Sequence, residues 1–117
     1  MRCAYLTLDE VNEALALEMA HGCGVLLCPL APKDAPPDGD YDAVLIDWDH
    51  WPAERREGLL TGLRAGPLPR PVAVHGYNLT DGQAAALRRA GVTVVRRRLT
   101  AWHVSRWCRR WAGVLAG

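Results

Sequence analysis

Four side chains that could do chemistry stand at the ends of two apolar runs in the middle of the sequence. Asp47, Asp49 and His50 end the first run, and His75 ends the second. Carboxylates bind Mg2+ and can act as nucleophiles, and an imidazole can hold a metal or move a proton. The alternative is an aspartate that only forms hydrogen bonds within a loop. The four cysteines and four histidines lack the spacing of a zinc site.

The elements that must position these side chains alternate between strand and helix. Five short apolar runs predict buried strands at 2–7, 25–28, 41–47, 71–74 and 92–96. Capping residues, apolar stripes and Gly or Pro stops predict helices at 11–19, 53–65, 80–89 and 100–115. Thr7 and Glu10 have the spacing of a capping box before the first helix. The alternation predicts a doubly wound α/β fold with a five-stranded parallel sheet, in a single domain over residues 1–117.

The sequence lacks the familiar enzyme motifs. It contains no G-x-G-x-x-G, no Walker-type G-x-x-x-x-G-K-[ST] and no G-x-S-x-G pattern. No apolar run reaches the roughly 20 residues of a membrane helix, and no signal-peptide pattern opens the chain. We therefore expect a cytoplasmic protein that is not an enzyme and has no membrane partner.

Three segments of the second half resemble response-regulator receiver domains of bacterial two-component systems. Residues 41–48 followed by Pro52 resemble their third strand and phosphoacceptor loop, and residues 71–76 resemble their fourth strand. Residues 90–100 are similar to the passage from their fifth strand into the last helix. The resemblance implies a flavodoxin-like sheet with strand order 2-1-3-4-5 and a role in signal transduction.

The resemblance places Asp47 at the phosphoacceptor position. Phosphoryl transfer to an aspartate needs Mg2+ held by carboxylates, and the family supplies an acidic pair at the end of its first strand. This chain has Leu6 and Thr7 there, with Asp9 and Glu10 following in the expected first helical turn. Asp49 is a further candidate ligand, so weak Mg2+ binding is the most we expect, and no other cofactor.

Two other switch positions of the family are changed. His75 stands where the family has a hydroxyl residue, and Arg97 stands where it has a lysine. These departures favour a degenerate receiver, or pseudo-receiver, that acts by protein association. A working phosphoacceptor remains the alternative, with Asp47 as nucleophile and Arg97 as phosphate clamp.

The expected second helix of the family is missing. Residues 31–40 contain three prolines and read as a loop, yet a parallel crossover usually takes a dozen or more residues. One consequence would be an apolar face left open over the first and third strands, which could receive a partner. The alternative is that Trp48, Trp51 and the loop cover this face.

Charge is divided between the two halves of the chain. Residues 1–58 hold twelve acids and four bases, whereas residues 59–117 hold ten arginines and Asp81 as the one acid. We expect one surface from the fourth helix, fifth strand and fifth helix, built by Arg88, Arg89, Arg96, Arg98, Trp102, Arg106, Arg109 and Arg110. It could be a solvated face, a contact for a homodimer or protein partner, or, as a less favoured alternative, a site for the nucleic-acid backbone.

Overall fold

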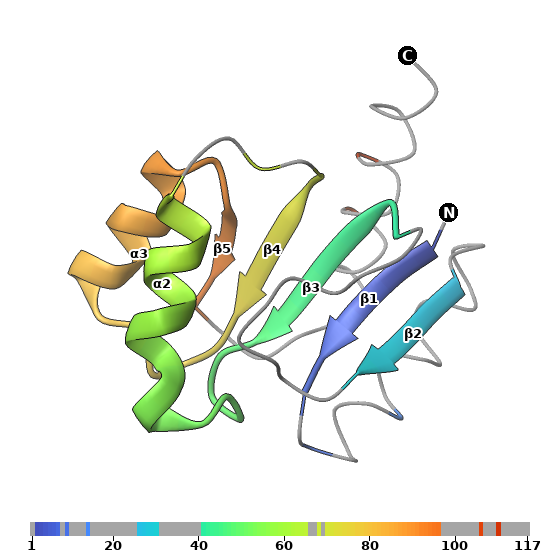
Figure 1. The fold of residues 1–117 in the computed structure, drawn as a ribbon, viewed down its shortest axis with the longest axis horizontal. Coiled ribbons are helices and arrows are strands. Elements are labelled where there is room, and N and C mark those ends of the chain that lie inside the picture. Colours follow the sequence, from blue (N-terminus) through green and yellow to red (C-terminus); the bar gives the residue numbers. More distant parts are fainter. Residues whose placement is uncertain are drawn as a thin grey trace.

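One parallel sheet of five strands forms the frame of the protein. The computed structural model describes residues 2–7, 9, 14, 26–30, 41–65, 68, 70–96, 106 and 110. The strands are β1 (Arg2–Leu6), β2 (Leu26–Leu30), β3 (Ala43–Asp47), β4 (Val72–His75) and β5 (Thr93–Val95). They lie in the order β2-β1-β3-β4-β5 and are all parallel (Figure 1). The α/β fold class and the strand order expected from the sequence are confirmed.

The bounds of β2 differ from those expected. The sequence predicts this strand at 25–28, but β2 begins at Leu26 and continues to Leu30, and Pro29 pairs with Tyr5 of β1. Proline cannot donate a ladder hydrogen bond, and it is tolerated in an edge strand where that donor has no strand to meet. β2 is an edge strand, so its proline interrupts nothing.

Two helices of the second half are described in full. The predicted helix at 53–65 consists of a 3-10 turn, η1 (Ala53–Arg55), followed by α2 (Arg56–Arg64), and the next helix is α3 (Asp81–Arg89). Ala14, Arg106 and Arg110 are also helical, in agreement with the other two helices expected. The remaining residues of those helices, and the loop at 31–40, lie outside the described residues.

Local sequence explains where α3 begins and ends. The Thr80 hydroxyl accepts a hydrogen bond from the Gln83 amide at 3.1 Å, and the Gln83 side chain accepts one from the Thr80 amide at 2.9 Å. This capping box satisfies two amides that the first turn leaves without a helical partner. Gly91 follows the helix with a φ of +89°, which glycine adopts without strain.

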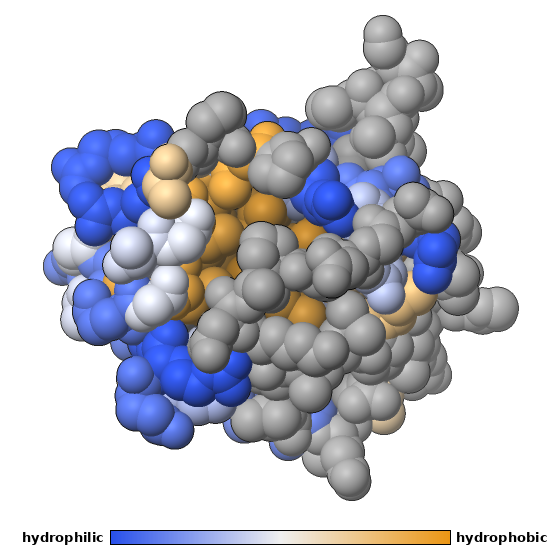
Figure 2. Space-filling model, viewed as in Figure 1, coloured by the Kyte–Doolittle hydropathy of each residue, from blue (hydrophilic) through white to orange (hydrophobic). Residues whose placement is uncertain are grey.

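The main core lies between the sheet and the layer formed by α2 and α3 (Figure 1). Alternate strand residues face this layer, because successive side chains of a strand point to opposite faces. The core contains Ala4, Leu6, Val44, Ile46, Val72 and Val74 from the strands, Leu60 and Leu87 from the helices, and Trp48, Trp51, Leu79 and Val92 from the connections. Figure 2 shows hydrophilic residues over the outside of these helices and hydrophobic residues in the strip beside α2.

The apolar face expected to be open over the first and third strands is covered. Ala4, Leu6, Val44 and Ile46 are at most 5% exposed. Trp48 and Trp51, at 0% and 3%, belong to the same core cluster. Burial of these strand residues contradicts an open apolar face there and agrees with the alternative in which Trp48 and Trp51 help to cover it; the loop at 31–40, which that alternative also includes, lies outside the described residues. Separately, none of the helices in the described part of the chain has the length and apolarity that crossing a bilayer requires.

Candidate functional site

Asp47 lies at the carboxyl end of the sheet and is almost fully buried, with 1% exposure. Its Oδ2 accepts a hydrogen bond from the Thr7 hydroxyl at 2.7 Å and one from His50 Nδ1 at 2.7 Å. Thr7 follows β1 and Asp47 ends the neighbouring β3, so the parallel register brings the two side chains together. Asp47 therefore joins two strand ends and the loop that follows β3.

His50 lies between two carboxylates. Its Nδ1 contacts Asp47, and its Nε2 lies 4.0 Å from Asp9 Oδ2, while 43% of the side chain is exposed. The Thr7 hydroxyl also accepts a hydrogen bond from the Asp9 amide at 3.0 Å. The capping role expected for Thr7 is thus present on the Asp9 amide, and Asp47, Thr7, Asp9 and His50 form one connected group.

A second polar pair is buried on the same face of the sheet. The Tyr5 hydroxyl and His75 Nε2 lie 2.8 Å apart, and the two residues are 0% and 3% exposed. Burial, and after it the negative charge of Asp47, raises the pKa of Tyr5 far above its usual 10.0, although a hydrogen bond with Thr7 acts in the opposite direction. The tyrosine is therefore held in its neutral form beside the carboxylate.

The raised pKa of Tyr5 predicts a loss of stability in alkali. Above pH 10 the unfolded chain loses the Tyr5 proton and the folded chain keeps it, so this group should lower the free energy of unfolding by about 1.4 kcal/mol per pH unit. Urea unfolding from about pH 9 to pH 11 measures the slope. Tyr5→Phe should remove this component, whereas Tyr77→Phe should not, because Tyr77 is 62% exposed. Equal slopes in the wild type and Tyr5→Phe would contradict the assignment.

Asp49 holds two loops together. Its carboxylate accepts hydrogen bonds from the amides of Tyr77 and Asn78 at 2.7 and 2.8 Å. Gly76 makes this approach feasible, because a Cβ there would lie 2.8 Å from Asp49 Oδ1 and 3.0 Å from Trp48 Cβ. Asp49, proposed from the sequence as a metal ligand, is thus placed to fasten the loop after β4.

Arg56, which the sequence did not indicate, completes the loop after β3. Its guanidinium donates to the carbonyl oxygens of Trp48 and Asp49, at 3.2 Å each, and lies 5.4 Å from the centre of the Trp48 ring. Sequence reasoning also missed Tyr5 and the bond from Thr7 to Asp47. Strand alternation was the available signal, because it places Tyr5, Thr7 and Asp47 on one face of the sheet.

The remaining predicted site residues include some that the structure describes and some that it does not. Glu10, Arg97, Arg98, Trp102 and Arg109 lie outside the described residues. Arg106 and Arg110 are exposed, as are Arg88 and Arg89 in the last turn of α3. Arg96 instead binds Asp81 and the Leu79 carbonyl at the opposite end of that helix. Arg96 and the pair Arg88 and Arg89 thus lie at opposite ends of α3, and the shared surface expected from the sequence stays a prediction.

The described site is a hydrogen-bonded network around Asp47. Within the described residues, no group of three or more His, Cys, Asp or Glu side chains is arranged to hold a metal ion. Asp47, Asp9 and His50 are close to one another, but Asp49 points its carboxylate at backbone amides. Chemically, the arrangement can position charge and protons at the carboxyl end of the sheet.

No protein-family model and no curated protein matches the sequence. Solved structures do match. A response regulator receiver protein from Pseudoalteromonas atlantica has a TM-score of 0.76 at 12% identity and covers 98% of this chain and 99% of its own. The protein has the receiver-domain fold. That likeness agrees with the flavodoxin-like fold implied by the resemblance, and at such identity it concerns the fold alone.

Two further receiver domains support the same conclusion. The receiver domain of a sensor histidine kinase from Pseudomonas aeruginosa, with a magnesium ion coordinated in its active site cleft, has a TM-score of 0.69 at 18% identity, covering 96% of this chain and 97% of its own. The ChxR receiver domain from Chlamydia trachomatis has a TM-score of 0.65 at 11% identity, covering 95% and 97%. This chain therefore matches the three solved chains over nearly their whole lengths.

Proposed function

We propose that this receiver-like domain is a non-catalytic signalling module that acts through protein association. The observation that carries the proposal is the environment of Asp47, whose Oδ2 accepts hydrogen bonds from Thr7 and His50. The other carboxylate oxygen, Oδ1, is also buried from solvent. A phosphodonor must reach a carboxylate oxygen in line with its leaving group, and burial of both oxygens opposes that approach.

The carboxylates near Asp47 also favour a structural role. Mg2+ is usually bound by one or two carboxylates together with water and phosphate oxygens, and it neutralises the transferring phosphoryl group. Both oxygens of Asp49 accept backbone hydrogen bonds, so metal binding by Asp49 would release the loop at Tyr77 and Asn78. This competition lowers the affinity expected for Mg2+.

The alternative is a phosphoacceptor in a two-component system. It is favoured by the position of Asp47 at the carboxyl end of β3 and by the shared fold of a receiver that holds magnesium. In this reading Asp47 is the nucleophile, Asp9, Glu10 or Asp49 would hold the metal, and Arg97 would contact the phosphoryl group.

Incubation with acetyl phosphate and Mg2+, followed by intact-protein mass spectrometry, separates the two. We expect no phosphoryl addition to the wild type under conditions in which an autophosphorylating receiver domain is fully labelled. Saturable addition that Asp47→Asn abolishes would establish the phosphoacceptor instead.

A further inference from the structure

Charged side chains are divided between the two edges of the sheet. In a parallel α/β fold the strands run one way and the connecting helices run back (Figure 1). Strand beginnings and helix ends therefore lie together along one border of the sheet. This border runs across the ends of all the strands, not along an edge strand, and is here called the amino edge. Strand ends and helix beginnings share the other, the carboxyl edge, which contains the Asp47 site.

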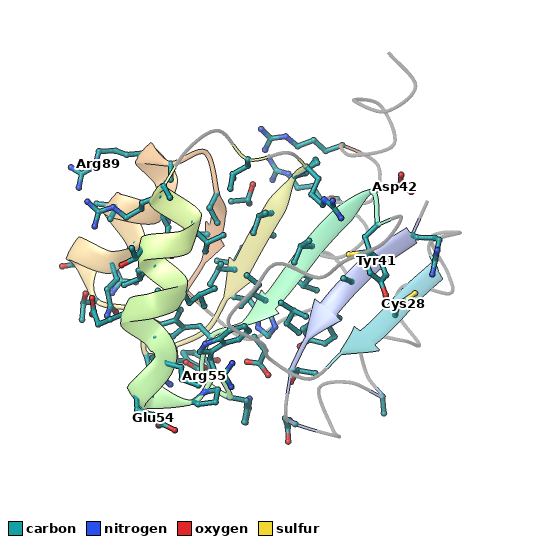
Figure 3. The ribbon with its side chains drawn as sticks, viewed as in Figure 1. Cys28, Tyr41, Asp42, Glu54, Arg55 and Arg89 are labelled. Carbon is teal, nitrogen blue, oxygen red and sulfur yellow. The ribbon has the colours of Figure 1, made fainter. Side chains whose placement is uncertain are left out.

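The amino edge is basic. The described charges there are Arg2, Asp42, Arg64, Arg70, Arg88 and Arg89, a net charge of +4. All of these arginines except the half-buried Arg70 are exposed. Figure 3 shows Arg89 at the end of the helical layer opposite to Glu54 and Arg55.

The carboxyl edge is acidic. The described charges there are Asp9, Asp47, Asp49, Glu54, Glu57 and Asp81 with Arg55, Arg56 and Arg96, a net charge of −3 with histidine neutral. Two of these arginines are held within the chain, Arg56 on loop carbonyls and Arg96 on Asp81 and the Leu79 carbonyl. Glu54 and Glu57 are exposed at the beginning of the α2 segment.

Helix dipoles account for part of this pattern. Acids in the first turn and arginines in the last turn stabilise a helix, which explains Glu57 and Asp81 at the helix beginnings and Arg64, Arg88 and Arg89 at the helix ends within one chain. Arg2 and Arg70 lie at the beginnings of strands, where no helix dipole favours a positive charge. These two arginines thus add positive charge to an edge that the helix ends already make basic.

We propose that copies of this chain associate head to tail, with the amino edge of one copy on the carboxyl edge of the next. The inference rests on the association function proposed above and names its surface and its partner. The chain itself supplies the complementary acidic surface, so a second copy satisfies both charged edges at once. Such a contact joins two different surfaces, so further copies can add and an open array can form. Contacts between exposed charges weaken with salt, since the Debye length is about 8 Å at physiological ionic strength.

Charge exchange tests the pairing directly. Arg88→Glu with Arg89→Glu takes the described charge of the amino edge from +4 to 0, and Glu54→Arg with Glu57→Arg takes that of the carboxyl edge from −3 to +1. We expect sedimentation velocity at low salt to show concentration-dependent association of the wild type, lost at high salt. Each double variant alone should associate about tenfold more weakly or worse. An equal mixture of the two variants should regain the association, because the two new glutamates of one variant can then meet the two new arginines of the other.

A matched pair of single variants separates the edge contact from net charge. Arg89→Glu and Arg55→Glu change the net charge equally, but only Arg89 lies on the amino edge. Arg89→Glu should weaken association and Arg55→Glu should not. A monomeric wild type at low salt, equal weakening by the two single variants, or no recovery on mixing folded double variants would overturn the proposal. Mass spectrometry measures phosphoryl addition separately, so the result of that experiment does not decide whether copies of the chain associate head to tail.

Discussion

Replacing Trp48 with alanine is expected to lower the free energy of unfolding by about 3–5 kcal/mol. Trp48 follows Asp47 directly, is 0% exposed and is among the largest fully buried side chains. Its indole contributes to the core between the sheet and the helical layer. Removal leaves a cavity and takes away the ring beneath the Arg56 guanidinium, so urea unfolding should shift strongly to lower concentrations.

Tyr77→Ala is the matched aromatic truncation for this test. Tyr77 lies in the loop after β4 and is 62% exposed, so its loss should change the free energy of unfolding by about 0.5 kcal/mol or less. Trp48→Phe should fall between the two, and it provides a folded reference if the alanine variant is too unstable to measure. Comparable losses for Trp48→Ala and Tyr77→Ala would show that Trp48 does not anchor the site.

Thr7→Val is expected to lower the free energy of unfolding by about 2–3 kcal/mol. Valine keeps the shape but removes the hydroxyl that donates to Asp47 Oδ2 and accepts from the Asp9 amide. A buried carboxylate that loses a donor is left with an uncompensated cost of desolvation. Urea unfolding at neutral pH measures the change.

Thr61→Val removes a hydroxyl of the same kind at an exposed position. Thr61 donates to the Glu57 carbonyl at 2.9 Å within α2, and its loss should change stability by about 0.5 kcal/mol or less. A double-mutant cycle with Asp47→Ala, which removes the acceptor that asparagine would keep, isolates the bond to Asp47, and we expect an interaction energy of about 1–2 kcal/mol. Independent effects of Thr7→Val and Asp47→Ala would contradict a direct role of Thr7 on the carboxylate.

Much of the fold could be predicted because its signals are local. The apolar run before Asp47 predicts a buried parallel strand, which is β3. Thr80 is predicted to cap a helix, and α3 begins at the next residue. The position of Asp47 at the carboxyl end of β3 follows from the same reasoning, since strand ends meet at one edge of a parallel sheet.

The contacts of the site could not be predicted, because they depend on register between distant segments. The sequence predicts Thr7 as a helix cap. The hydrogen bond that its hydroxyl also donates to Asp47 spans 40 residues of sequence. Asp49 read as a metal ligand, but the loop after β4 places two amides on its carboxylate. Arg96 is expected on one basic surface with Arg88 and Arg89, but its contact with Asp81 lies at the other end of α3.

We propose that Asp47 is a hydrogen-bonded support of the carboxyl edge and takes no phosphoryl group. The most direct test is to titrate isotope-labelled protein with beryllofluoride in the presence of Mg2+ and to follow its amide NMR signals. Beryllofluoride bound to an aspartate imitates an aspartyl phosphate. We predict no saturable shift at the amides of Thr7, Asp47, Trp48 or His50. The spectra with Mg2+ and beryllofluoride should be identical to those with Mg2+ alone. Saturable shifts at these amides that are absent in Asp47→Asn would contradict the account.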